Sequence, residues 1–295
     1  IGYAAGGALN TGGNNTLIGR NSGLVMTSAS GNVGVGRDTL QSATDSNDNV
    51  AIGYGALRDT TTGASNVGVG ALALEENISG TRNVAVGFQA LENPDAENDN
   101  LAIGYEALGG AVAGGEQNVA IGNYSLDALT SGDNNVAVGF EALTTNTAEA
   151  GIVAVGYRAL ATLNGGDGQS VAVGSEALEA TTTGAYNTAV GYQALKANTD
   201  GATNVAVGSS ALVGNTTGDR NIGIGQATIY QADTENDNVA IGNAALAGVI
   251  AGGEYNVAIG NNTLDALTSA DNNVAIGYGA GGAINTGGNN TIMGY

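Results

Sequence analysis

Three carboxylates at alternate positions form the arrangement best suited to chemistry, and it occurs twice, with the second copy offset by 138 in the numbering. The members of the two sets are Asp95, Glu97 and Asp99, and then Asp233, Glu235 and Asp237. Ca²⁺ prefers several oxygen ligands of this kind. No complete calcium-binding loop motif surrounds either set. We therefore favour a solvated acidic face and expect no metal or other cofactor.

The side chains needed for acid–base and nucleophilic catalysis are scarce. The chain has no histidine, no cysteine and a single lysine, Lys196. General acid–base catalysis most often uses histidine, and a nucleophile needs a base that activates it. Paired carboxylates such as Glu75 and Glu76 lie in polar segments without such partners. The sequence therefore predicts that the protein is not an enzyme.

Aromatic residues recur directly after a glycine that is itself periodic. Six of them are Tyr54, Phe88, Tyr105, Phe140, Tyr157 and Tyr192. Exposed rings in a row could stack on the sugar rings of a glycan, whereas buried rings would pack along the repeat or between chains. We favour packing. If the chain is a structural shaft, Tyr54, Tyr105 and Tyr157 are expected to be largely buried.

A short repeat must position all of these residues. Each copy of a short motif, such as NVAIG at 49–53, ends in a glycine that we call the anchor. The anchor recurs from Gly2 to Gly294, with a spacing of 17 residues in fourteen intervals and of 18 in three. Helix pairs and propeller blades need about 20 to 50 residues per repeat and are excluded. The sequence predicts an all-β fold, a parallel β-solenoid (β-roll) of about 18 turns of 17–18 residues. Residues 1–295 form a single continuous repeat region.

The nonapeptide NVAIGYGAL at 49–57 shows how one turn is expected to be built. Val50 and Ile52 point to one side of a strand and Ala51 to the other, because side chains alternate along a strand. We predict a strand of about five residues whose Val–Ile face is buried and whose Ala–Gly face contacts a neighbouring chain. Leucine or isoleucine four residues after the anchor, as at Leu57, adds a buried stripe through 14 consecutive turns.

Asparagine lies four residues before the anchor in 15 of 17 turns, with Ile152 and Ser170 as the exceptions. Stacked amides could hydrogen-bond from turn to turn as a ladder. The alternative is a residue that merely favours the turn before each strand. The predicted structural ladder comprises Asn49, Asn66, Asn83, Asn100, Asn118, Asn135, Asn187, Asn204, Asn221, Asn238, Asn256 and Asn273.

A longer period of eight turns, an offset of 138 in the numbering, is superimposed on the short one. Segment 98–122 returns in closely similar form at 236–260, and segment 1–20 returns at 276–295 with 15 of 20 positions identical. Tandem duplication explains this pattern more simply than selection on individual sites. We therefore expect the chain to be a fragment of a longer fibre.

The charge of the chain excludes one class of partner. Seven basic residues against 27 acidic ones leave a net charge of −20, which repels the phosphates of nucleic acid. No run of 18 apolar residues is present, so no membrane insertion is expected within this segment.

The NVAIG and NVAVG elements resemble the repeats in the heads of trimeric autotransporter adhesins. The longer NTAVGYQAL at 187–195, with TTG in the polar turns, is similar to repeat arrays of phage tail-fibre and bacterial surface fibre proteins. This resemblance covers essentially the whole chain, although adhesin-head repeats are shorter. It implies a left-handed coil, a homotrimer and an extracellular, cell-surface or virion location. Residues 52–57 also fit the hexapeptide of left-handed β-helix acyltransferases, but only a third of each turn matches.

The function expected from these features is that of a structural shaft in an extracellular fibre or filament, such as a phage tail fibre, a bacterial adhesin or a surface filament. The shaft would provide reach and present a tip located elsewhere. The shaft would associate with further copies of the same chain, as a homotrimer or higher fibre assembly. Other domains would contact a host-cell glycan or protein. The alternative is a carbohydrate- or surface-binding module that uses the aromatic residues or the acidic turns directly.

Overall fold

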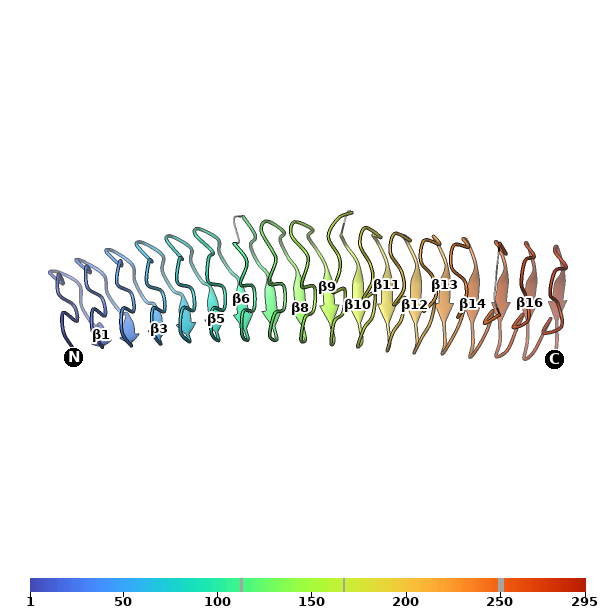
Figure 1. Ribbon diagram of the computed structural model, residues 1–295, viewed down its shortest axis with the longest axis horizontal. Helices are drawn as coiled ribbons and strands as arrows, with labels where there is room; N and C mark the ends of the chain where they lie inside the picture. Colours follow the sequence, from blue (N-terminus) through green and yellow to red (C-terminus); the bar gives the residue numbers. More distant parts are fainter. Residues whose placement is uncertain (112–113, 167, 249–251) are drawn as a thin grey trace. The chain divides into compact units, whose positions relative to one another are not determined.

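A computed structural model describes residues 1–111, 114–166, 168–248 and 252–295. The repeated segments 98–122 and 236–260 each include positions outside these ranges. The contacts divide the chain into two units, Ile1–Gly151 (unit 1) and Ile152–Tyr295 (unit 2). The described residues form only strands and turns, with no helix and hence no segment that could cross a membrane as a helix (Figure 1).

Each strand is three residues long, shorter than the five predicted, and covers the Val-Ala-Val/Ile core of the motif. Unit 1 contains β1 (Thr16–Ile18), β2 (Val33–Val35), β3 (Val50–Ile52), β4 (Val67–Val69), β5 (Val84–Val86), β6 (Leu101–Ile103), β7 (Val119–Ile121) and β8 (Val136–Val138). Unit 2 contains β9 (Val153–Val155), β10 (Val171–Val173), β11 (Thr188–Val190), β12 (Val205–Val207), β13 (Ile222–Ile224), β14 (Val239–Ile241), β15 (Val257–Ile259), β16 (Val274–Ile276) and β17 (Thr291–Met293).

Within each unit, consecutive strands pair in parallel and in register. Val50 lies opposite Val67 in unit 1, and Val205 lies opposite Ile222 in unit 2. One strand per turn, paired with its copy in the next turn, defines a parallel β-solenoid and confirms that part of the predicted fold. The described strands enclose about 16 turns, because a turn is the interval between two consecutive strands. The predicted number of 18 counted the anchor glycines instead of these intervals.

The strands alternate as predicted, but the prediction of which face is buried was wrong. Ala51 at the strand centre is fully buried, whereas Ile52 is 39% exposed. From β2 to β16 the interior is too narrow for β-branched side chains at the strand centre, because that centre packs directly on leucine; only the end strands β1 and β17 carry larger residues there, Leu17 and Ile292. A Cβ placed on Gly68, the strand centre of the next turn, would lie 3.4 Å from Leu57 Cδ1. Small residues therefore face inward, and valine and isoleucine face outward.

The leucine stripe is buried as predicted. Its members, Leu40, Leu57, Leu74, Leu91, Leu108, Leu126 and Leu143 in unit 1 and Leu160, Leu178, Leu195, Leu212, Ile229, Leu246 and Leu264 in unit 2, are all fully buried. Every one has a positive φ, for example 52° at Leu57. A left-handed conformation costs an L-residue roughly 1–2 kcal/mol. Burial of the side chain and the hydrogen bond from Leu57 N–H to the carbonyl oxygen of Ala73 (3.0 Å) offset this cost.

Candidate interaction surface

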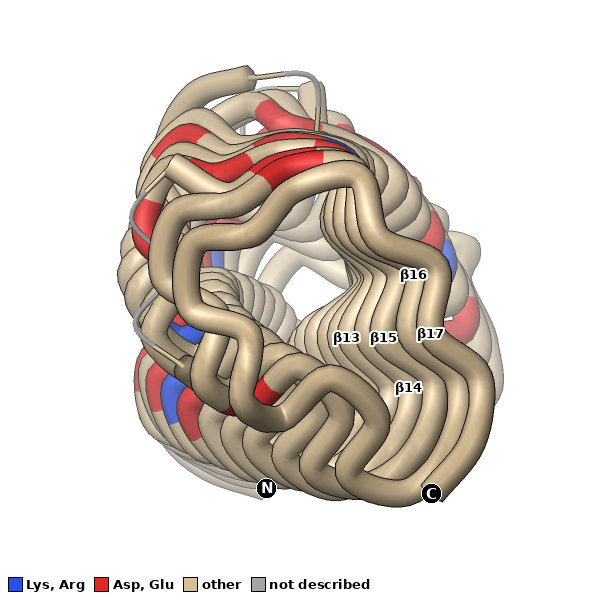
Figure 2. Tube along the Cα trace, turned by 90° about the vertical axis from the view of Figure 1, so that its right-hand side faces the viewer, with Lys and Arg blue, Asp and Glu red and all other residues tan. Residues whose placement is uncertain are grey.

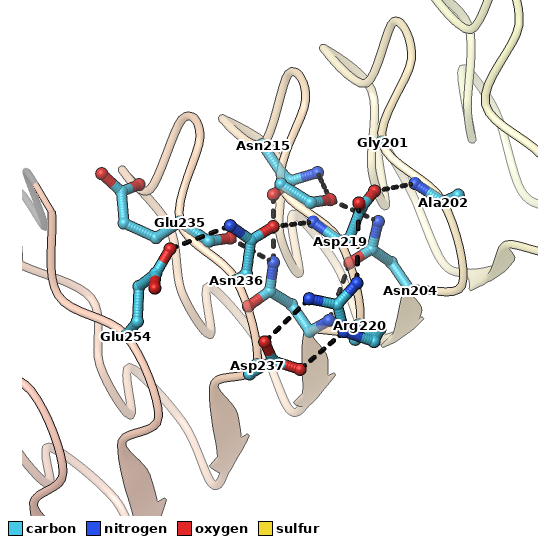
Figure 3. Close-up of polar contacts among 12 residues, drawn as sticks. Gly201, Ala202, Asn204, Asn215, Asp219, Arg220, Glu235, Asn236, Asp237 and Glu254 are labelled. Carbon is cyan, nitrogen blue, oxygen red and sulfur yellow. Dashed lines mark hydrogen bonds and ion pairs between the residues drawn. The ribbon is translucent and has the colours of Figure 1, made fainter.

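The asparagines named in the sequence as a ladder are all buried at the entrance to their strands. Asn204 illustrates their geometry in unit 2 (Figure 3). Its backbone N–H donates to Oδ1 of Asn187 (2.9 Å), and its own Oδ1 accepts the N–H of Asn221 (2.8 Å). Its Nδ2 donates to the carbonyl oxygen of Gly218 (2.7 Å). Each amide thus joins its own turn to the one after it.

We call this arrangement the inner ladder, and it repeats in both units. In unit 1 the N–H of Asn66 donates to Oδ1 of Asn49 (2.8 Å), and Asn66 Nδ2 donates to the carbonyl oxygen of Gly80 (2.8 Å). Ser170, one of the two sequence exceptions, still accepts the N–H of Asn187 through Oγ (3.1 Å). The inner ladder satisfies backbone groups that would otherwise be buried without a partner, which is a structural role.

A second row of side chains, two residues before the inner ladder, was not recognised in the sequence. Oδ1 of Asp219 accepts the N–H of Ala202 (2.7 Å), and Oδ1 of Asn236 accepts the N–H of Asp219 (2.7 Å) (Figure 3). We call this the outer ladder; it also includes Asn47, Asn98, Asp133 and Asp271. A recurrent Asn or Asp two residues before the ladder asparagine was the available signal. It was hidden because alanine or glycine replaces it in several turns.

Two carboxylates from the predicted acidic sets are held by arginines one turn earlier. Asp99 accepts two hydrogen bonds from Arg82 (2.6 and 2.7 Å), and Asp237 accepts two from Arg220 (2.7 and 2.8 Å). These hydrogen bonds from arginine hold the pKa of both aspartates below the usual range. Both carboxylates thus serve as partners in ion pairs between turns.

The remaining carboxylates of the two sets do not converge with them. Glu97 and Glu235 are buried, and Glu235 accepts backbone N–H groups of Asp233 (2.9 Å) and Gly252 (2.8 Å). Asp95 and Asp233 are exposed. Among the described residues, no three acidic side chains lie where they could hold one metal ion. The described contacts of Asp99, Asp237 and Glu235 thus lie within and between neighbouring turns.

A hollow in unit 1 is lined partly by acidic side chains. Its volume is about 390 Å³, and its lining consists of Asp59, Glu76, Ile78, Asn93 and Asp95. Three of these side chains are carboxylates, and they surround the apolar side chain of Ile78.

The six aromatic residues are exposed in the single chain, by 40% at Tyr105 and 47% at Tyr54 and Tyr157. The expected burial of these three tyrosines is therefore not observed. In unit 1 the rings of Phe88 and Tyr105 stack at 5.3 Å between centroids, and Tyr124 contacts Tyr105 edge-on at 5.4 Å. Stacked neighbours cover each other's faces, which favours packing between turns in this part of unit 1.

The other aromatic candidates lie in different surroundings. Phe140 contacts Tyr124 at nearly right angles, with centroids 6.1 Å apart, and Arg37 lies 5.4 Å from the ring of Tyr54. The rings of Tyr157 and Tyr192 are 47% and 52% exposed. Stacking on sugar rings stays a prediction for these residues.

Asp127 is a half-buried carboxylate next to this aromatic run. Thr144 Oγ1 donates a hydrogen bond to its Oδ1 (2.5 Å), but burial, with the nearby charges of Glu106 and Glu141, raises the pKa of Asp127 above its ordinary value of 3.8. Loss of its proton therefore costs the folded state more than the unfolded state.

We expect Asp127→Asn to stabilise unit 1 at neutral pH. Because the folded pKa is raised, the penalty is complete above that pKa and disappears as the pH falls towards 3.8. Thermal unfolding of both proteins across this pH range measures the difference. A stability gain that persisted unchanged at the acidic end would contradict the electrostatic explanation.

The outward side of the strands carries an apolar row in each unit, which we call the outward row. It consists of the third residue of strands β2 to β16: Val35, Ile52, Val69, Val86, Ile103, Ile121 and Val138 in unit 1, and Val155, Val173, Val190, Val207, Ile224, Ile241, Ile259 and Ile276 in unit 2. Exposed fractions reach 36–39% at Val207 and Ile224. Strands β13 to β17 carry no charged residue, and the acidic residues of the trace lie in the turns (Figure 2).

The fold and its surfaces define a class, a parallel β-solenoid of tandem turns bonded through buried asparagines. No protein-family model matches the chain, and neither the curated proteins nor the solved structures include a significantly similar one.

Proposed function

We propose that the chain is a structural shaft that self-associates through the outward row as a left-handed homotrimer. The observation that carries this proposal is the outward row itself. Apolar residues at the same place in successive turns give each unit an apolar strip whose periodicity matches that of a second copy. Soluble single chains rarely expose long apolar patches unless another surface covers them.

A second copy of the chain is the occupant that the charges favour. With a net charge of −20, copies repel each other except where the surface is uncharged, and the strands are the uncharged part. A stable interface needs roughly 800 Å² per partner. The row spans every turn of each unit, so its contribution grows with the number of turns. Cyclic symmetry lets identical strips cover one another without leaving an open end.

The proposed biological role is mechanical. A trimeric rod of stacked turns would provide reach in an extracellular fibre on a cell surface or virion, such as a tail fibre, adhesin or filament. Recognition of a host-cell glycan or protein would be carried out by a tip located elsewhere. The absence of histidine and cysteine from the sequence, and the dispersal of the carboxylates that the structure describes, support a structural role over catalysis.

Charges placed on the outward row are expected to break the assembly without unfolding the chain. Because Val207 and Ile224 point outward from β12 and β13, the double variant Val207→Lys, Ile224→Lys leaves the interior unchanged. Burying two unpaired ammonium groups against another copy is strongly unfavourable. Sedimentation equilibrium should give a trimer for the wild type and a single chain for this variant, with unchanged circular dichroism.

A matched control places the same two charges on the polar turns of the same repeats. Thr217 and Thr234 are polar residues of these turns. Thr217→Lys, Thr234→Lys should remain trimeric. A wild-type chain that sediments as a monomer, or a control that dissociates as readily as the strand variant, would contradict the proposed interface.

A further inference from the structure

The dipeptide Asn164–Gly165 stands apart from every other asparagine in the chain. It is the only Asn-Gly in a sequence with 51 glycines. It lies in unit 2, in the interval from Gly156 to Gly174, which is one residue longer than the common interval between anchors. Asn164 is exposed, unlike the buried ladder asparagines.

Ladder asparagines are protected from attack by their own backbone. Cyclisation of an asparagine requires the nitrogen of the next residue to reach the side-chain carbonyl carbon. After Asn204, that nitrogen belongs to Val205, whose N–H donates to the carbonyl oxygen of Asn221 (2.8 Å). The amide of Asn204 is buried and held by Gly218. The hydrogen-bonded nucleophile, the fixed amide and the β-branched neighbour each oppose ring closure.

The surroundings of Asn164 differ in the residue that supplies the nucleophile. Its successor Gly165 has no side chain to hinder ring closure and lies outside the strands, with φ at +144°, and Gly166 follows with φ at +83°. Glycine reaches backbone conformations that other residues avoid, which lowers the cost of bringing the nitrogen to the amide. The N–H of Asn164 itself donates to the carbonyl oxygen of Thr182 (3.1 Å), which ties this segment to the next turn.

We propose that Asn164 is a site of spontaneous covalent modification, in which its amide is converted to a carboxylate through a cyclic imide. The Gly165 nitrogen loses its proton to solvent base and attacks Cγ of Asn164. A nitrogen–carbon bond forms, the bond from Cγ to the amide nitrogen breaks, and ammonia leaves. Water then opens the imide at either carbonyl, which leaves aspartate or isoaspartate. One water is consumed and one ammonia is released, with no oxidation or reduction.

The product would change both charge and backbone length at one turn. A new carboxylate would lie near the segment of Thr182 and Thr183, whose hydroxyls already donate to Oδ1 of Asp200 (3.0 and 2.7 Å). Isoaspartate adds a carbon to the backbone, and it would do so in an interval that already contains one extra residue. The modification would therefore add negative charge at one position along unit 2 as the protein ages, whatever the oligomeric state.

Peptide mapping by mass spectrometry of the purified full chain, incubated folded at neutral and mildly alkaline pH, tests the proposal. Exposed Asn10, which precedes Thr11, and buried Asn204 are internal controls. We expect Asn164 to lose its amide roughly an order of magnitude faster than Asn10, and faster at higher pH. Fragmentation should reveal both aspartate and isoaspartate, and Asn164→Gln should abolish the early acidic species. Loss at Asn164 no faster than at Asn10 would overturn the proposal.

Discussion

Replacement of Gly208 by alanine is expected to destabilise unit 2 by about 4 kcal/mol or more, because the anchor position has no room for a Cβ. Gly208 has φ of +136°, and a Cβ built on it would lie 2.5 Å from the carbonyl oxygen of Gly225 in the next turn. That oxygen belongs to backbone and cannot rotate away. Gly208 N–H also donates to the carbonyl oxygen of Val190 (2.8 Å), so the turn is held from the other side.

Gly279→Ala provides the matched control for this substitution in the same unit. Gly279 also has a positive φ, +62°, but a Cβ there would meet no atom within 4 Å. The equivalent position carries Ala227 at φ 53° and Ala244 at φ 51°, so alanine is tolerated in this conformation. We expect a loss of about 1–2 kcal/mol in the free energy of unfolding, the cost of the left-handed conformation alone. Equal losses for both variants, measured by denaturant unfolding, would disprove the steric argument.

Removal of one inner-ladder amide is expected to have the second largest effect. Asn204→Ala leaves the buried N–H of Asn221 without its acceptor. It also removes one of two hydrogen bonds to the carbonyl oxygen of Gly218, which still accepts from Nδ2 of Asn215 (3.0 Å). An unsatisfied buried group costs about 1–3 kcal/mol and a lost hydrogen bond about 0.5–1.5 kcal/mol, so unit 2 should lose about 2–4 kcal/mol of stability. Denaturant unfolding measures this loss, and hydrogen exchange should show the faster exchange of the Asn221 amide.

Serine provides a graded comparison at the same position. Ser170 occupies the inner ladder naturally and accepts the N–H of Asn187 through its Oγ. Asn204→Ser should therefore keep an acceptor for Asn221 and lose only the bond to Gly218, whose carbonyl oxygen still accepts from Asn215, at a cost of about 0.5–1.5 kcal/mol. If serine were as damaging as alanine, the acceptor function of Asn204 would not explain its stabilising effect.

The sequence predicted the period, the parallel pairing and the leucine stripe because each depends on spacing alone. It did not predict which strand face is buried, because Val50 and Ala51 alternate whichever way the strand faces. The direction depends on the width of the interior, where the strand centre meets Leu57, and that is a property of the closed turn. Hydrophobicity favoured burial of valine, but from β2 to β16 the space at the strand centre is occupied only by alanine or glycine.

The surface features were harder to predict for a related reason. The positive φ of Leu57 contradicts the general preference of leucine, and only the stacked backbone makes it necessary. The outer ladder through Asp219 and Asn236 depends on which turn each side chain reaches, which composition does not indicate. The inner-ladder position was visible because asparagine recurs there almost without interruption.

In-register stacking also has a mechanical consequence for each unit. Hydrogen bonds between turns join a residue mainly to its neighbours one turn away, so within the chain an interior turn is bonded chiefly to the two turns beside it. Cooperativity in such an array is a nearest-neighbour property. Tension applied along the chain would therefore peel turns off one after another, each releasing a similar length of polypeptide at a similar force. The array would therefore dissipate mechanical work in small steps of similar size.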